Sequence, residues 1–230
     1  MIAAVIFDMD GVLVDTEQVW DEVREQLVAD WGGRYTAAAQ RTMMGMSSGE
    51  WSRYMHDELG LRQTPEEIND EVVLRMLGRY RVELPLIDGA VEAVRGLARE
   101  IPLAVASSSN RPLIDTVLAT AGIADCFTAT VSSEEVARGK PSPDVYLEAA
   151  SRLGVAPSAC IAVEDSANGI RAAAEAGMNV VAYPNRHYAP DAEALAFADT
   201  VIDSLSEVAA AVTGFSRSPG CTRSQGRLTL

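Results

Sequence analysis

The sequence predicts an α/β fold in which a parallel β-sheet is covered by helices on both faces, with a helical segment inserted after the first strand. From residue 86 onward, short apolar runs alternate with amphipathic or Ala-rich stretches, which is typical of a parallel sheet with crossover helices. Residues 15–85 break this alternation and contain no strand pattern. The chain has 230 residues, of which 48% are hydrophobic, so it can form such a core together with a smaller module.

Six short apolar segments are the expected strands. The first, residues 3–7, includes Val5 and Ile6 and is apolar throughout, as a strand buried on both faces requires. Four further strands are expected at residues 102–107, 127–131, 160–163 and 179–183, and residues 200–202 are a weaker candidate.

The segments between these strands have the features of helices. They cover residues 89–100, 112–121, 143–153 and 167–176. Pro112 and Pro143 suit the first helical turn, where a missing backbone N–H costs nothing. Gly122, Gly154 and Gly177 suit C-terminal caps, which often need a left-handed backbone.

The insert and the C-terminal segment differ from the rest of the chain. Apolar side chains recur at helical spacing in residues 17–31, and residues 64–67 form a capping box with Pro at the first helical position. We expect residues 1–14 and 86–212 to form the α/β core and residues 15–85 to form a helical cap, either a lid or a packing module without function. Residues 213–230, rich in Ser, Gly and Arg, are expected to form a flexible tail.

Composition excludes several classes of function. The net charge of −14 argues against a nucleic-acid groove or an anionic membrane surface as partner. No apolar run approaches the roughly 18 residues of a membrane span, and the first apolar run is too short and lacks the basic start of a signal peptide. The three Cys show no metal-binding spacing, which suits a reducing compartment. We therefore expect a cytoplasmic monomer whose partner is a small molecule.

Residues that can perform chemistry follow four of the expected strands. They are Asp8 and Asp10, the Ser-Ser-Ser-Asn run at 107–110, Lys140, and the pair Glu164 and Asp165. Singly, each cluster could be a turn, a helix cap or a surface Lys. Together they supply a nucleophile, hydroxyl donors, a cation and metal-binding acids at one edge of a sheet, the set that phosphoryl transfer needs. Lys140 is also the one Lys among 19 basic residues, which a bias toward Arg does not explain.

In order and spacing, these clusters resemble the motifs of the haloacid dehalogenase superfamily. Residues 8–15 resemble D-x-D-G-x-L-x-D, Lys140 stands in a K-P-x-P setting, and residues 163–170 resemble the metal-binding motif of the subfamily with a helical cap after the first strand. The resemblance spans about residues 2–185. It implies a Rossmann-like parallel-sheet core with a helical cap domain.

The resemblance also implies catalytic roles. Asp8 would be the nucleophile that forms an aspartyl phosphate, and Asp10 the general acid/base. Ser107 would bind a phosphate oxygen, and Lys140 would brace the phosphate and the nucleophile.

The resemblance further implies a metal and a substrate site. Mg²⁺ would be held by Asp8, the backbone carbonyl of Asp10, and Asp165, with Glu164 or water completing the shell. Candidates to contact a small phosphorylated metabolite are Ser108 and Asn110 in the serine loop, and Glu17, Trp20, Met43, Met44, Ser47 and Trp51 in the cap. Trp20 and the two Met could equally be cap core.

Within the superfamily, the sequence resembles the β-phosphoglucomutases and the sugar-phosphate phosphatases. The mutases place a His about twelve residues after the nucleophile and an Arg in a G-x-S-R loop of the cap, where this chain has Trp20 and Ser48. We therefore favour a Mg²⁺-dependent phosphatase acting on a sugar phosphate or similar monoester. The alternatives are a mutase, in which Arg75 or Arg79 would bind a second phosphate, and a non-catalytic regulatory protein on the same fold.

Overall fold

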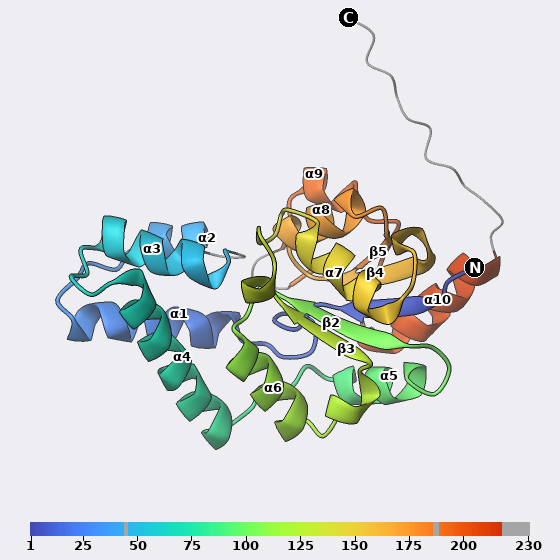
Figure 1. Ribbon diagram of the computed structural model, residues 1–230, viewed down its shortest axis with the longest axis horizontal. Coiled ribbons are helices and arrows are strands. Elements are labelled where there is room, and N and C mark those ends of the chain that lie inside the picture. Colours follow the sequence, from blue (N-terminus) through green and yellow to red (C-terminus); the bar gives the residue numbers. More distant parts are fainter. Residues whose placement is uncertain (44–45, 186–188, 218–230) are drawn as a thin grey trace, which may run out of the picture.

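The computed structural model describes residues 1–43, 46–185 and 189–217. At its centre lies a six-stranded sheet in the order β3-β2-β1-β4-β5-β6, in which all paired strands are parallel. The strands are β1 (Ala4–Phe7), β2 (Leu103–Ser107), β3 (Ala129–Ser132), β4 (Cys160–Glu164), β5 (Asn179–Ala182) and β6 (Thr200–Val201). The predicted α/β class and parallel sheet are therefore confirmed (Figure 1). Strand β3 begins two residues later than predicted, because a 3₁₀ turn at Ala124–Cys126 precedes it.

The alternation of side chains along β1 explains why both faces of the sheet are covered. Ala4 and Ile6 belong to one apolar cluster, with residues of α7 (Asp144–Leu153) and α8 (Ala167–Glu175). Val5 and Phe7 belong to the other, with residues of α5 (Ala90–Leu97), α6 (Arg111–Thr120) and α10 (Val208–Arg217). Figure 1 shows these two layers above and below the strands. Such three-layer packing leaves the carboxyl ends of the strands as the open edge where a site can form.

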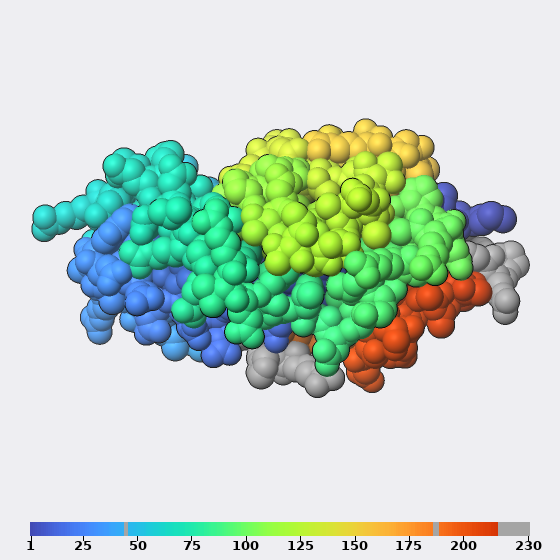
Figure 2. Space-filling model, turned by 90° about the horizontal axis from the view of Figure 1, so that it is seen from below, coloured from blue at the N-terminus to red at the C-terminus, as the bar shows by residue number. Residues whose placement is uncertain are grey.

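The chain leaves the core after β1 and returns beside the same point. The backbone N–H of Asp15 donates to the carbonyl of Pro85 at 2.8 Å, and that of Ile87 donates to the carbonyl of Leu13 at 3.0 Å. Between these points lie α1 (Glu17–Asp30), α2 (Ala37–Met43), α3 (Ser48–Leu59) and α4 (Pro65–Val82). Figure 2 shows this part gathered at one end of the molecule. We propose that residues 15–85 act as the cap unit and the rest of the sheet-bearing chain as the core.

The helix ends follow the chemistry that the sequence suggests. Thr64 Oγ1 accepts a hydrogen bond from the N–H of Glu67 at the start of α4. Gly122, Gly154 and Gly177, which follow α6, α7 and α8, all have positive φ, the conformation that glycine adopts without a steric cost.

The C-terminal helix is longer than the sequence suggests. Helix α10 runs to Arg217 and so enters the segment predicted to be a tail, because Val212 and Phe215 pack against the apolar cluster. The remainder of that segment, including Cys221, lies outside the described residues, as do Met44 and His187. A short four-residue helix, α9 (Ala192–Leu195), precedes β6. Within the described ranges, no helix combines the length and apolar character needed to cross a membrane.

Candidate active site

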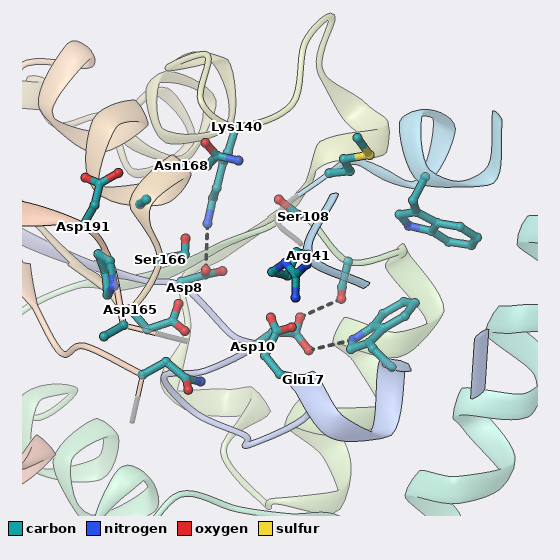
Figure 3. Close-up of a pocket in the computed structure, with 18 residues that line it drawn as sticks. Asp8, Asp10, Glu17, Arg41, Ser108, Lys140, Asp165, Ser166, Asn168 and Asp191 are labelled. Carbon is teal, nitrogen blue, oxygen red and sulfur yellow. Dashed lines mark hydrogen bonds and ion pairs between the residues drawn. The ribbon is translucent and has the colours of Figure 1, made fainter. Parts of the chain in front are cut away.

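The carboxyl ends of β1, β2 and β4, with the loop after β3, border a pocket of about 550 Å³ (Figure 3). Its core side includes Asp8, Asp10, Ser108, Ser109, Lys140, Asp165, Ser166 and Asn168, and its cap side includes Glu17, Trp20, Arg41, Met46 and Trp51. The pocket thus joins residues that are far apart in the sequence. It lies at the edge where the order of the strand motifs predicts a site.

Lys140 lies between two buried carboxylates. Its Nζ is 2.9 Å from Asp8 Oδ2 and 2.6 Å from Glu164 Oε1. Burial alone would lower the pKa of Lys140, but the charges of Asp8 and Glu164 raise it above its ordinary value. The Lys140 ammonium is therefore a permanent positive charge beside Asp8, whose other oxygen accepts the backbone N–H of Met9 at 2.7 Å.

Glu164 is fully buried, and both of its oxygens are engaged. Oε1 also accepts the hydroxyl of Tyr146 at 2.8 Å, and Oε2 accepts the N–H of Asp165 at 3.0 Å and the N–H and hydroxyl of Ser166 at 3.1 Å each. Burial raises the pKa of Glu164, but Lys140 brings it below its ordinary value. These contacts make Glu164 an anionic anchor that fixes Lys140 and the start of α8.

Asp165 differs from Glu164 in that no donor to its carboxylate is found among the described residues. It is buried, and its carboxylate accepts no hydrogen bond within the described part of the chain. A carboxylate oxygen from each of Asp8, Glu164 and Asp165 lies within 4.8 Å of the others. Burial, reinforced by the mutual repulsion of these charges, raises the pKa of both Asp8 and Asp165 well above the ordinary value. Three buried carboxylates with one ammonium leave a negative excess, and their oxygen donors fit a hard divalent cation.

Asp10 lies at the pocket wall and is not part of this acid cluster. Its Oδ1 accepts hydrogen bonds from the Thr16 hydroxyl and, at 3.2 Å, from the indole Nε1 of Trp20, and its Oδ2 accepts the Ser109 hydroxyl at 2.7 Å. Asp10 is thus connected both to the serine loop after β2 and to the first turn of α1.

The serine loop is only partly arranged as predicted. Ser108 lines the pocket, and its buried hydroxyl has no hydrogen-bond partner among the described residues. Ser107 is fully buried beneath it, and its Oγ accepts the N–H of Ser109 at 3.0 Å. Asn110 lies outside the pocket lining, because its Nδ2 donates to Asn69 of α4 at 3.0 Å and to Glu134 at 2.6 Å.

The cap side of the pocket is an aromatic wall with a buried cation behind it. The rings of Trp20 and Trp51 are 6.0 Å apart in an edge-to-face arrangement, and the guanidinium of Arg24 lies 4.6 and 4.9 Å from their centroids. Both Trp are almost completely buried and yet line the pocket. The two interpretations of Trp20, as cap core and as pocket residue, therefore apply together.

The other cap candidates occupy different places. Ser47 is not among the pocket residues; its hydroxyl donates to Glu50 Oε2 at 2.6 Å in the capping box of α3. It also contacts the loop that precedes Lys140, since a Cβ added to Gly139 would lie 2.9 Å from the Cβ of Ser47. Met43 is buried in the cap. Arg41 faces the pocket and forms no ion pair or hydrogen bond within the described residues.

Glu17 lies half-buried at the junction of pocket and cap. Burial, followed by the charge of Asp10, raises the pKa of Glu17 to about 7, although Arg24 opposes the shift. The pKa in the folded protein exceeds the ordinary value of 4.5, so its contribution to stability is present below pH 4.5 and is lost as the pH rises through 7.

We therefore expect Glu17→Gln to stabilise the protein at pH 8 and to have a smaller effect at pH 5. Because the side chain retains some access to solvent, the difference between the two pH values should be about 1–2 kcal/mol. Urea unfolding at both pH values measures it. Glu25→Gln, an exposed change on the same helix, should show no such pH dependence, and equal effects of Glu17→Gln at both pH values would contradict the raised pKa.

The sequence did not single out several residues that the structure places at the site. Ser109 belongs to the recognised serine run, and Thr16 directly follows the first motif, so their proximity to Asp10 had a weak signal. The sequence contains no such signal for Tyr146, Arg24 and Arg41, because helical spacing alone does not reveal which polar residue turns toward a site.

Comparison with known proteins agrees with this geometry. A family model for haloacid dehalogenase-like hydrolases matches residues 2–177. Hexitol phosphatase B from Escherichia coli (strain K12) is 34% identical over 91% of this chain and 95% of that protein. The phosphorylated carbohydrates phosphatase of Thermotoga maritima is 32% identical over 86% of this chain and 92% of its own. The crystal structure of CbbY from Rhodobacter sphaeroides in complex with phosphate superposes with a TM-score of 0.80 at 26% identity, covering 90% of this chain and 96% of that one.

The parallel six-stranded sheet and the acidic pocket at its carboxyl edge, together with these matches, define a hydrolase with a Rossmann-like α/β core. The chain belongs to the haloacid dehalogenase-like hydrolase family. The resemblance inferred from its strand-end motifs is therefore confirmed.

Proposed function

We propose that the protein is a Mg²⁺-dependent phosphatase that hydrolyses a small phosphate monoester, such as a sugar phosphate, through an aspartyl phosphate on Asp8. The observation that supports it best is the state of Asp8, which faces the pocket while Lys140 and the N–H of Met9 fix its two oxygens. A carboxylate held in this way is oriented for attack rather than for structural pairing.

Asp8 and Asp165 are the side chains that would hold the cation, with Glu164 adjoining them. When bound, Mg²⁺ would offset the repulsion between the phosphate and the carboxylates and stabilise charge on the transferred phosphoryl group. Asp165 is buried, and its carboxylate accepts no hydrogen bond in the described part of the chain, which supports this assignment.

The remaining steps belong to side chains of the chain itself. An oxygen of Asp8 bonds to phosphorus while the bond from phosphorus to the leaving oxygen breaks, and Asp10 gives that oxygen a proton. Asp10 then takes a proton from water as the water attacks phosphorus and releases Asp8. We propose that Lys140 and the hydroxyl of Ser108, which both line the pocket, bind the phosphoryl oxygens.

The two cap cations considered for the second phosphate of a mutase are engaged in ion pairs. Arg75 pairs with Asp30 and Glu71, and Arg79 pairs with Glu22, so neither is available for a second phosphate. We propose that Glu17 and Arg41 instead contact hydroxyl groups of the leaving alcohol, one as acceptor and one as donor. The cytoplasmic location and the monomeric state of the protein stay predictions.

A panel of phosphorylated metabolites tests this function. We expect release of inorganic phosphate from sugar or polyol monophosphates, dependence on Mg²⁺, and loss of activity in excess chelator. With β-glucose 1-phosphate and a bisphosphate primer, glucose 6-phosphate should not form faster than inorganic phosphate. Full turnover in chelator would reject the metal, and rapid formation of glucose 6-phosphate would favour the mutase.

The metal site gives a separate prediction for Gly11→Ala. An added Cβ would lie 1.9 Å from Asp165 Oδ2, so this carboxylate would have to move. We expect the Mg²⁺ concentration for half-maximal activity to rise about 10- to 100-fold, as when a metal ligand loses its support.

Gly32→Ala is the matched control for this substitution. Gly32 has nearly the same φ, 76° against 77°, but nothing lies within 4 Å of its added Cβ. Both variants bear a backbone strain of about 1–2 kcal/mol, to which Gly11→Ala adds the clash with Asp165, but only Gly11→Ala should change the Mg²⁺ requirement. Equal Mg²⁺ titrations of the two variants would rule out the proposed role of Asp165.

A further inference from the structure

The two carboxylate oxygens of Asp10 accept hydrogen bonds from different kinds of donor. Oδ1 accepts from Trp20 Nε1 and from the Thr16 hydroxyl, whereas Oδ2 accepts only from the Ser109 hydroxyl among the described residues. An indole N–H can donate but cannot accept, whereas a hydroxyl can rotate and do either. A proton on Oδ1 would therefore oppose the Trp20 N–H, whereas a proton on Oδ2 can be accommodated by rotation of Ser109.

We infer that Trp20 is a positioning residue for the general acid: its indole N–H keeps Oδ1 of Asp10 as an acceptor and so assigns the transferable proton to Oδ2. This inference rests on the phosphatase function proposed above. In the step concerned, the Asp8 oxygen–phosphorus bond forms, the phosphorus–leaving oxygen bond breaks, and the proton of Oδ2 passes to the leaving oxygen. Ser109 then donates again to the ionised Oδ2.

The surroundings of Trp20 hold its N–H in place. The side chain is 6% exposed, its ring meets that of Trp51 edge to face, and the Arg24 guanidinium lies 4.6 Å from its centroid. Trp20 is in the first turn of α1, whereas Asp10 follows β1. The hydrogen bond therefore joins the cap to the catalytic loop.

The dependence of the rate on the leaving group distinguishes this role from a structural one. A sugar alkoxide is a poor leaving group and needs a proton, whereas p-nitrophenolate is a stable anion and needs little assistance. We expect Trp20→Phe, which keeps an aromatic ring but removes the N–H, to lower kcat for sugar phosphates about 10- to 100-fold, part of the about 10²–10⁴ that general acid catalysis supplies. For p-nitrophenyl phosphate, kcat should change less than about threefold, with KM little altered for either ester.

Two variants serve as controls. Trp31→Phe removes an indole at the far end of α1, which is not among the pocket residues, and should leave the ratio of the two rates unchanged. Trp20→His restores a ring N–H and should recover part of the loss. Equal losses of Trp20→Phe on both esters would show a structural role and overturn the inference. A wild-type enzyme that cleaves neither ester would instead refute the proposed phosphatase.

If Trp20→Phe does not fold, the hydrogen bond can be tested by NMR in a protein that retains Trp20. The chain has three Trp, so ¹⁵N-labelled indole gives three resonances. In Asp10→Ala, the Trp20 N–H proton should move upfield while those of Trp31 and Trp51 stay in place. An unmoved Trp20 resonance would overturn the inference.

Discussion

Replacing Asp8 by Asn is expected to reduce kcat on the order of 10⁴- to 10⁶-fold, the size of loss that follows removal of a covalent nucleophile. Asn keeps the shape of the side chain but cannot attack phosphorus as an anion. It would also remove the ion pair with Lys140 Nζ at 2.9 Å. Release of inorganic phosphate from a sugar phosphate, followed under single-turnover conditions, measures the loss.

Two further observations make this result specific. Asp125→Asn, an exposed change in the 3₁₀ turn before β3, should leave turnover intact. In Asp10→Asn treated with p-nitrophenyl phosphate, whose leaving group needs little protonation, mass spectrometry should detect a phosphorylated chain, because dephosphorylation by water needs the Asp10 base. No such adduct should form when Asp8→Asn is added. An adduct on the double variant, or substantial activity of Asp8→Asn, would place the nucleophile elsewhere.

Replacing Lys140 by Met is the second change with a large expected effect. It would leave the carboxylates of Asp8 and Glu164 buried without the ammonium that lies within 2.9 and 2.6 Å of them. Breaking a buried ion pair from one side costs about 3–5 kcal/mol. We also expect kcat to fall at least about 10²-fold, because fixed positive charge at the phosphoryl group is lost.

The pH dependence separates this effect from a simple packing defect. Lys140 holds the pKa of Glu164 below its ordinary value of 4.5. A lowered pKa contributes stability above pH 4.5 that is lost as the pH falls through the lowered value. The variant lacks this contribution, so its deficit in unfolding free energy should be largest at neutral pH and should shrink in acid. A deficit that is constant with pH would indicate lost packing alone.

Arg138→Met provides the comparison for Lys140→Met. Arg138 lies two residues earlier and pairs with Asp144 at 2.9 Å, but its side chain is 71% exposed. Because solvent screens this exposed pair, the loss of stability should be much smaller than for Lys140→Met. A large loss for Lys140→Met and a small one for Arg138→Met would show that burial, rather than ion pairing alone, determines the loss of stability.

Much of the fold was predictable from the sequence, because the strands of a parallel sheet are short, apolar and separated by helical segments. The convergence of Asp8, Lys140 and Asp165 was predictable for the same reason, since carboxyl ends of parallel strands share one edge. The contacts between these strand-end loops and the cap were not predictable from the sequence. Asn110 follows the serine loop in sequence, yet its amide turns to Asn69 of the cap.

The cap illustrates the limit of spacing arguments more clearly. Arg75 and Arg79 were the cations considered for a second phosphate, but both form ion pairs with cap acids. Arg24 and Arg41 lie closer to the pocket or its aromatic wall. Nothing in helical periodicity distinguishes these four residues, because each one's surroundings depend on how the four cap helices pack.

The contact between Ser47 and Gly139 sets how closely the two halves of the enzyme can meet. The capping box of α3 rests on a residue without a side chain, immediately before Lys140. A single methyl group at this position would act as a wedge between cap and catalytic loop. The distance between the cap and the loop that carries Lys140 therefore depends on a hydrogen atom at Gly139 where other residues have a carbon.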